Sequence, residues 1–147
     1  MFLRLLTLGL TALIMIPGGA HLLELPAKMQ LTQSEYFAVQ RIYSGWAMFS
    51  VAIFAAIIAN GLLFWSLRDI DMPAARAALA SALLICLTLV LFFILVFPGN
   101  QATNSWTSVP ANWETLRRNW EYGHAVNAVI TFIAVLATAR AIMGNTR

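Results

Sequence analysis

Two short pairs of a histidine and a glutamate are the residues of this chain whose types and spacing could do chemistry. His21 lies three residues before Glu24, and Glu121 lies three residues before His124. A spacing of three places both side chains of a pair on one face of a helix. Imidazole and carboxylate groups together bind iron, zinc, copper or manganese. The pairs use both histidines of the 147-residue chain and are therefore the first candidates for a functional site.

The segments that carry these pairs are apolar and long enough to span a membrane. The chain is 61% hydrophobic and 10% charged, whereas soluble domains carry about a quarter charged residues. About 20 apolar residues cross the roughly 30 Å hydrocarbon core of a bilayer. Four segments meet this requirement, at about residues 2–25, 43–67, 74–97 and 120–143. The sequence predicts one all-α membrane domain over residues 1–147, a transmembrane four-helix bundle of up-down-up-down order.

The connections of this bundle are unequal in length. The segment 98–119 is a long loop between the third and fourth helices, which we interpret as a lid. In an up-down-up-down bundle, the end of the first helix and the start of the fourth lie at the same membrane face. The two pairs are therefore expected to converge there.

The distribution of cations predicts the orientation in the membrane. The two sides carry these cations: Arg4, Arg68, Arg76, Arg140 and Arg147 on one, and Lys28, Arg41, Arg117 and Arg118 on the other. By the positive-inside rule, both termini are cytoplasmic and the site lies near the extracytoplasmic face, in what we expect to be a bacterial inner membrane. Lys28 and Arg41 are expected to mark the membrane interface.

The first apolar segment has two further features. Arg4, an apolar stretch and Gly18-Gly19-Ala20 also resemble a secretory signal peptide, but we interpret the segment as a membrane helix. Pro17-Gly18-Gly19 either loosens the helix for a ligand or is a packing kink. The single cysteine, Cys86, excludes an intrachain disulfide and is expected to be a small buried hydrophobe.

A single transition-metal ion held by His21, Glu24, Glu121 and His124 is the site that these residues predict. Iron suits the set best, copper or zinc is an alternative, and open positions could bind dioxygen or substrate. Glu24 and Glu121 are also candidates for moving a proton. The second and third helices supply no glutamate for a di-iron set. Two alternatives stay open: the pairs form a structural polar latch, or the two histidines ligate a haem, which leaves the glutamates unexplained.

Several residues near the second pair have two interpretations. Trp106, Trp113 and Trp120 are either interfacial anchors or an aromatic lid over a flat, lipophilic substrate. Asn127 follows His124 on a similar helix face. It either orients the imidazole by a hydrogen bond or bridges two helices.

The second half of the chain resembles a known family. The run from Phe97 through Asn100, Asn104 and Trp106, and the run from Pro110 through Trp113 and Trp120 to His124, are similar to the anthrone-oxygenase-like family of small four-helix membrane proteins. The match covers about residues 98–134. Gly123 precedes His124 where many members have asparagine, and Asn127 stands where they have arginine.

The resemblance implies an oxygenase that acts on a lipophilic aromatic substrate with dioxygen. It implies these site residues: Asn100, Asn104, Trp113, Trp120 and His124. We assign the first four of them, together with Asn127, to cofactor binding.

Two functional hypotheses follow from the sequence. The first is a metal-dependent oxidoreductase or oxygenase in the membrane that acts on a lipophilic, aromatic or quinone-like small molecule. The second is a non-catalytic membrane subunit, or a protein that binds a small molecule or haem. Transport is a weaker third, because no inverted repeat is present. The expected partners are the lipid bilayer, the lipophilic substrate and a second copy in a homo-oligomer. Nucleic acid is not expected, because most cations flank apolar runs.

Overall fold

The computed structural model describes residues 1–143, and these residues contain helices and turns but no strand. The elements are α1 (Phe2–Leu13), α2 (Met15–Lys28), α3 (Gln33–Val39), η1 (Gln40–Tyr43), η2 (Trp46–Met48), α4 (Phe49–Leu67), α5 (Met72–Leu91), η3 (Phe92–Val96), α6 (Phe97–Ala102) and α7 (Trp113–Ile142). Arg147, which was counted among the cations, lies outside the described residues.

Four helical stretches are long and apolar enough to cross a membrane: Phe2–Lys28, Trp46–Leu67, Met72–Ala102 and Trp113–Ile142. Many of their large apolar side chains are exposed, including Phe54, Leu83 and Phe132. Such extensive apolar surface suggests a lipid environment and is compatible with an integral membrane protein. The prediction of an all-helical chain with four membrane-length helices is confirmed.

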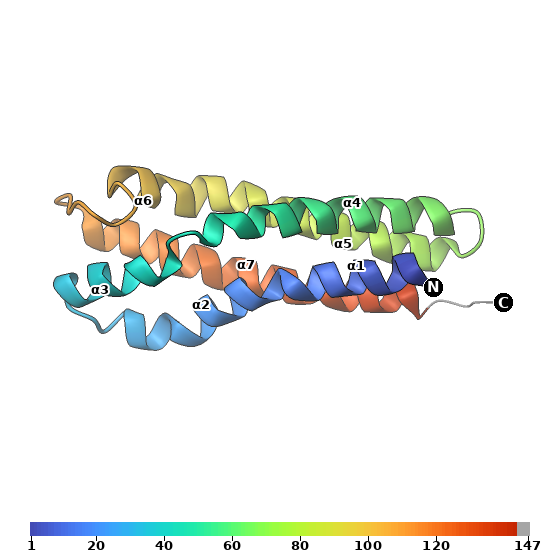
Figure 1. The fold of residues 1–147 in the computed structure, drawn as a ribbon, viewed down its shortest axis with the longest axis horizontal. Helices are drawn as coiled ribbons and strands as arrows, with labels where there is room; N and C mark the ends of the chain where they lie inside the picture. Colours follow the sequence, from blue (N-terminus) through green and yellow to red (C-terminus); the bar gives the residue numbers. More distant parts are fainter. Residues whose placement is uncertain (144–147) are drawn as a thin grey trace.

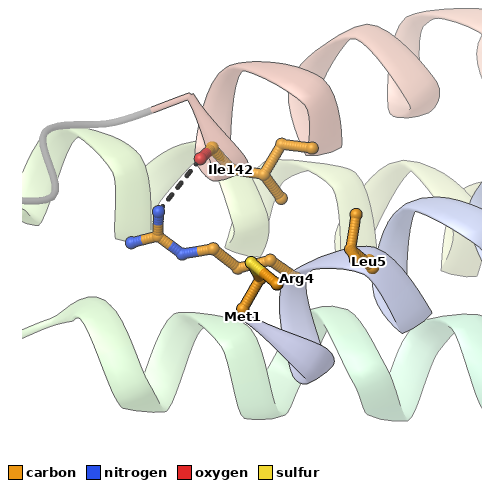
Figure 2. A pocket seen from close by; sticks show the side chains of 4 residues that line it. All are labelled: Met1, Arg4, Leu5 and Ile142. Atoms are coloured by element: carbon orange, nitrogen blue, oxygen red, sulfur yellow. Dashed lines mark hydrogen bonds between the residues drawn. The ribbon is translucent and has the colours of Figure 1, made fainter.

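The helices lie side by side in an elongated bundle (Figure 1). Figure 1 shows the N-terminus, the turn between α4 and α5, and the end of α7 at one end of the bundle, with α3 and α6 at the other. α5 packs along both α4 and α7. α1 packs on α4, and α2 packs on α7. Near the N-terminus, a guanidinium nitrogen of Arg4 donates a hydrogen bond to the Ile142 carbonyl at 3.1 Å, which ties α1 to the last turn of α7 (Figure 2).

A buried polar network joins the four long helices. Asn60 of α4 donates to the Thr11 hydroxyl of α1 at 3.0 Å and accepts from Thr138 of α7 at 3.0 Å. The Thr138 hydroxyl is 2.8 Å from that of Ser81 on α5. All four side chains are buried. Since lipid offers no hydrophobic force that would choose a register between apolar helices, such hydrogen bonds help to set it.

The first membrane segment is interrupted where the sequence suggested a kink. α1 ends at Leu13 and α2 begins at Met15. The break has a direct cause, because the ring of Pro17 clashes with the carbonyl four residues earlier, that of Leu13, and Pro17 has no N–H to donate to it.

The expected loop of 98–119 is helical at both of its ends. The third stretch passes through the π-helical turn η3 and continues in α6 to Ala102, and α7 begins at Trp113. The irregular connection therefore covers residues 103–112. Asn104, Ser105 and Trp106 take φ angles of 48°, 56° and 64° there, so the chain makes a left-handed turn.

An aromatic cap covers the α3 and α6 end of the bundle. Thr32 starts α3 by donating from its N–H and its hydroxyl to the Glu35 carboxylate, at 2.9 and 2.6 Å. The cap is a cluster of buried side chains that come from α3, η3, the 103–112 connection and α7: Tyr36, Phe37, Val96, Trp106 and Trp120.

Candidate functional site

The two histidines lie against each other, although they are 103 positions apart in the chain. The ring centroids of His21 on α2 and His124 on α7 are 4.1 Å apart, and the ring planes are inclined by 26°. His21 is only 3% exposed. The expected meeting of the first and fourth membrane segments therefore occurs at the imidazoles.

A close approach of α2 to α7 places these rings. A Cβ added to Gly18 would lie 3.3 Å from the Cα of Ala128, so a larger residue would push the two backbones apart by a few tenths of an ångström. Gly18 precedes His21 by about one turn, and Ala128 follows His124 by about one turn. The imidazoles therefore face each other just beyond the contact. This is a structural role for the Pro17-Gly18-Gly19 segment.

Glu121 is fully buried and binds groups from three other elements. Its Oε1 lies 2.8 Å from the Lys28 ammonium and accepts a hydrogen bond from the Tyr36 hydroxyl at 2.9 Å. The Gln40 amide donates to the same oxygen at 3.4 Å. The carboxylate thus ties α7 to α2, α3 and η1.

Lys28 stands between the two glutamates. Its side chain is buried, and its ammonium is 3.9 Å from the Glu24 carboxylate as well as 2.8 Å from that of Glu121. The ammonium also lies 4.5 Å from the ring centre of Tyr43 and 4.8 Å from that of Trp120. The Tyr43 hydroxyl donates to Glu24. We call these side chains the buried polar cluster, although Glu24, Tyr43 and His124 are half-buried: His21, Glu24, Lys28, Tyr36, Gln40, Tyr43, Glu121 and His124.

Lys28 was expected to mark the membrane interface and lies at the end of the first membrane-length stretch, but its side chain is buried inside the bundle, which the sequence analysis did not predict. The available signal was its spacing of four from Glu24, which puts both on one face of α2. Tyr36, Gln40 and Tyr43 were also missed. They belong to a short helical segment between the apolar helices, and nothing in their spacing predicts that this segment folds back over the bundle.

The two tyrosines of the cluster are held in their neutral form. Burial, followed by the charge of Glu121, raises the pKa of Tyr36 far above its ordinary value of 10.0. Burial and the hydrogen bond to Glu24 raise the pKa of Tyr43 in the same direction. Both hydroxyls are therefore hydrogen-bond donors to carboxylates at neutral pH.

The four-ligand metal site finds no support in this geometry. Among residues 1–143, no group of three or more histidine, cysteine, aspartate or glutamate side chains could hold a metal ion. The ammonium of Lys28 takes the position between Glu24 and Glu121 that a cation would need. Haem does not fit either, since its axial ligands lie on opposite faces of the porphyrin. The stacked rings of His21 and His124 leave no space for one.

Trp120 and Asn100 border the cluster. The Trp120 ring centre is 4.3 Å from that of His124 and 4.9 Å from that of His21. The Asn100 side-chain oxygen accepts from the indole N–H of Trp120 at 2.9 Å and from that of Trp106 at 3.0 Å. Asn100 therefore fixes the indole that packs on both histidines.

The other three predicted binding residues make different contacts. The Trp113 ring packs on Tyr36, with the Arg117 guanidinium 4.7 Å from its centre. Asn104 is exposed in the left-handed turn. Asn127 donates to the Thr88 carbonyl of α5 at 3.1 Å, which is the helix-bridging role weighed for it.

No protein-family model, no curated protein and no solved structure matches the chain. The resemblance to the anthrone-oxygenase-like family stays a prediction.

Proposed function

We propose that this protein is a membrane-embedded oxidoreductase that acts on a lipophilic phenol or quinol, with the buried polar cluster as its acid–base site. The observation that carries the proposal is the stacked pair His21–His124 beside the buried ion pair Lys28–Glu121. Ionisable groups within membrane segments are costly and mark functional sites. A cluster of proton-exchanging groups enclosed by aromatic rings suits a flat substrate with an ionisable oxygen.

The cluster has free bonding capacity for such an oxygen. Besides the ion-paired Lys28 Nζ, three buried atoms of the cluster have no hydrogen-bond partner among the described residues: His21 Nδ1, Glu121 Oε2 and Gln40 Oε1. A neutral imidazole nitrogen accepts a proton from a phenolic hydroxyl. Lys28 would then stabilise the phenolate, and Glu121 and Glu24 would hold the ammonium in place and take part in moving the proton.

The oxidation balances with dioxygen, the oxidant that the family resemblance implies. A quinol loses both hydroxyl protons and a pair of electrons, and becomes a quinone. Dioxygen takes up the electrons and protons and becomes hydrogen peroxide. A metal-dependent mechanism, with iron, copper or zinc, would require the Lys28 ammonium to move away from the two carboxylates. We therefore derive no step from a metal.

The finer placement in the membrane belongs to the same proposal. We infer an up-down-up-down order with both termini cytoplasmic, in a bacterial inner membrane, and the cluster near the extracytoplasmic face. The positions of the chain ends and turns in Figure 1 support the order, and the cation distribution supports the orientation. Protease or cysteine-labelling experiments on intact cells test it, and labelling of the Asp69 turn from outside would reverse the orientation.

Oxygen consumption by the purified protein in lipid nanodiscs tests the activity. The substrates are a panel of alkylhydroquinones and anthrone, and the variants are His21→Ala and His124→Ala. We expect each variant to lose at least about a hundredfold in rate, because general acid–base groups contribute that much. Cys86→Ala, away from the cluster, is the control. No oxygen uptake by the unaltered protein with any substrate, or full activity in His124→Ala, contradicts the proposal. Element analysis of the same samples tests the metal-dependent variant.

A structural latch is the second candidate, favoured by one observation: Glu121 joins α7 to three other elements. If the cluster is only a latch, any loss of oxygen-consumption rate in the histidine variants is matched by an equal loss of folded protein. If it is an active site, the rate falls far more than the folded fraction does. Circular dichroism on the same nanodiscs measures that fraction.

A further inference from the structure

An apolar groove runs between α1 and the start of α4. It has a volume of about 490 Å³, and its walls include Leu10 and Leu13 on one side and Met48, Phe49, Ala52 and Ala55 on the other. All of these residues belong to membrane-length helices. The groove is therefore open to the lipid phase.

Trp46 connects this groove to the buried polar cluster. Its ring centre lies 5.9 Å from that of Phe49 in the groove wall, 5.7 Å from that of His21 and 4.9 Å from that of Tyr43. Gly45, with a φ of 85°, turns the chain in the left-handed region just before it. Only glycine adopts this φ without strain. One half-buried indole thus separates the groove from the cluster.

We propose that the groove holds the alkyl or prenyl tail of an amphiphilic phenol or quinol, whose oxygen-bearing head lies at His21 and Tyr43. The inference rests on the proposed function for the chemistry of the head. The groove walls offer no polar group that could bind a head, whereas the cluster next to it has unpartnered polar atoms. The tail gains little from leaving lipid, so its main effect is to orient the head.

The charges of the cluster favour this occupant over a phospholipid. The ammonium of Lys28 is already paired with the carboxylates of Glu24 and Glu121, so the cluster has no free cation to bind a phosphate head. A phenolic hydroxyl donates a hydrogen bond and carries no charge. The site therefore fits an uncharged hydrogen-bond donor on a long tail.

Photolabelling locates the tail without requiring turnover. The probe is pentadecylphenol with a diazirine in its chain, added to the full-length protein in phosphatidylcholine nanodiscs, with the labelled peptides mapped by mass spectrometry. We expect labels in residues 10–13 and 48–55, and competition by unlabelled pentadecylphenol. Ala55→Leu narrows the groove and should reduce the apparent affinity about tenfold. Ala80→Leu, on the exposed face of α5, is the matched control and should change nothing.

The remaining outcomes distinguish a failure of the inference from a failure of the proposed function. If photoactive phosphatidylcholine labels the groove equally well and pentadecylphenol does not compete, bulk lipid fills the groove. That result overturns the inference. Labelling of other segments does the same. Groove labelling by the phenol in a protein that never consumes oxygen supports the inference and counts against the oxidoreductase. Oxygen consumption that is unaffected by tail length and by Ala55→Leu supports the oxidoreductase and counts against the groove.

Discussion

Replacing Lys28 by methionine is the sharpest test of how the buried polar cluster is built. Methionine keeps much of the apolar stem but removes the ammonium, which lies 2.8 Å from the buried Glu121 carboxylate. Glu121 is fully buried, so the loss of the ammonium leaves its carboxylate in the interior without an ionic partner. The free energy of unfolding is expected to fall.

The size of this fall follows from the separation and the burial. At 2.8 Å and an effective dielectric constant of about 20, the attraction between the two charges is roughly 6 kcal/mol. Desolvation costs several kcal/mol for each ion, so the intact pair contributes little net stability. Removing one partner leaves the desolvation cost of the other, and this typically costs about 3–5 kcal/mol. Lys28→Met should therefore destabilise by about that amount.

The assay is unfolding in mixed micelles followed by circular dichroism, with Asp69→Asn as the control. Asp69 pairs with Arg68 at 3.3 Å but is 85% exposed, so its loss should cost less than about 1 kcal/mol. Adding Glu121→Gln to Lys28→Met removes the unpaired charge and should restore part of the stability. The reasoning is refuted if Lys28→Met is as stable as the unaltered protein, or if the double variant is less stable than Lys28→Met.

Three further predictions concern the surroundings of the cluster. Because the pKa of Tyr36 is raised in the folded protein, its stabilising contribution is complete below the ordinary pKa of 10.0 and is lost as the pH rises above it. Tyr36→Phe should therefore make the free energy of unfolding less dependent on pH above about pH 10, which unfolding at several pH values measures. Tyr122→Phe, at an exposed position of α7, should not have this effect. Asn100→Ala removes the acceptor of two indole N–H groups and should lower the unfolding free energy by about 1–3 kcal/mol, with a changed near-ultraviolet circular dichroism spectrum. Gly123→Ala places a Cβ 3.0 Å from a side chain of the neighbouring helix and should cost about 1–3 kcal/mol. Gly61→Ala meets no atom within 4 Å and should be neutral or stabilising by up to about 1 kcal/mol, and equal effects of the two glycine variants would contradict the packing argument.

The membrane helices could be predicted from the sequence because their length and hydropathy are fixed by the bilayer and not by tertiary contacts. Pro73 also indicated where the third segment begins, and the Asp71 carboxylate indeed accepts from the Ala74 N–H there at 3.0 Å. The end of that segment was set too early. Pro98 lies in the first turn of α6, where the missing N–H of a proline is tolerated, so it does not end the helical stretch.

The site was predicted only in part, for a physical reason. The pairing of His21 with His124 follows from helix order and needs no side-chain detail. The partner of each glutamate, in contrast, depends on the fold of residues 29–45, where α3 and η1 bring a tyrosine and a glutamine onto Glu121. The spacing of four between Glu24 and Lys28 places both on one face of α2, but it does not show whether that face turns toward the membrane surface or inward to a second carboxylate.

A structural latch and an active site need the same polar residues here, because hydrogen bonds help to set the register of apolar helices in lipid. The Asn60 network and the buried polar cluster differ in one respect that favours a binding role for the cluster. The Asn60 side chain donates and accepts within its network, so each of its polar atoms has a partner. In the cluster, His21 Nδ1 and Glu121 Oε2 are buried without a partner among the described residues. Leaving such an atom unsatisfied costs about 1–3 kcal/mol. A latch gains nothing from this cost, whereas a site that must bind the oxygen of a substrate requires free acceptors.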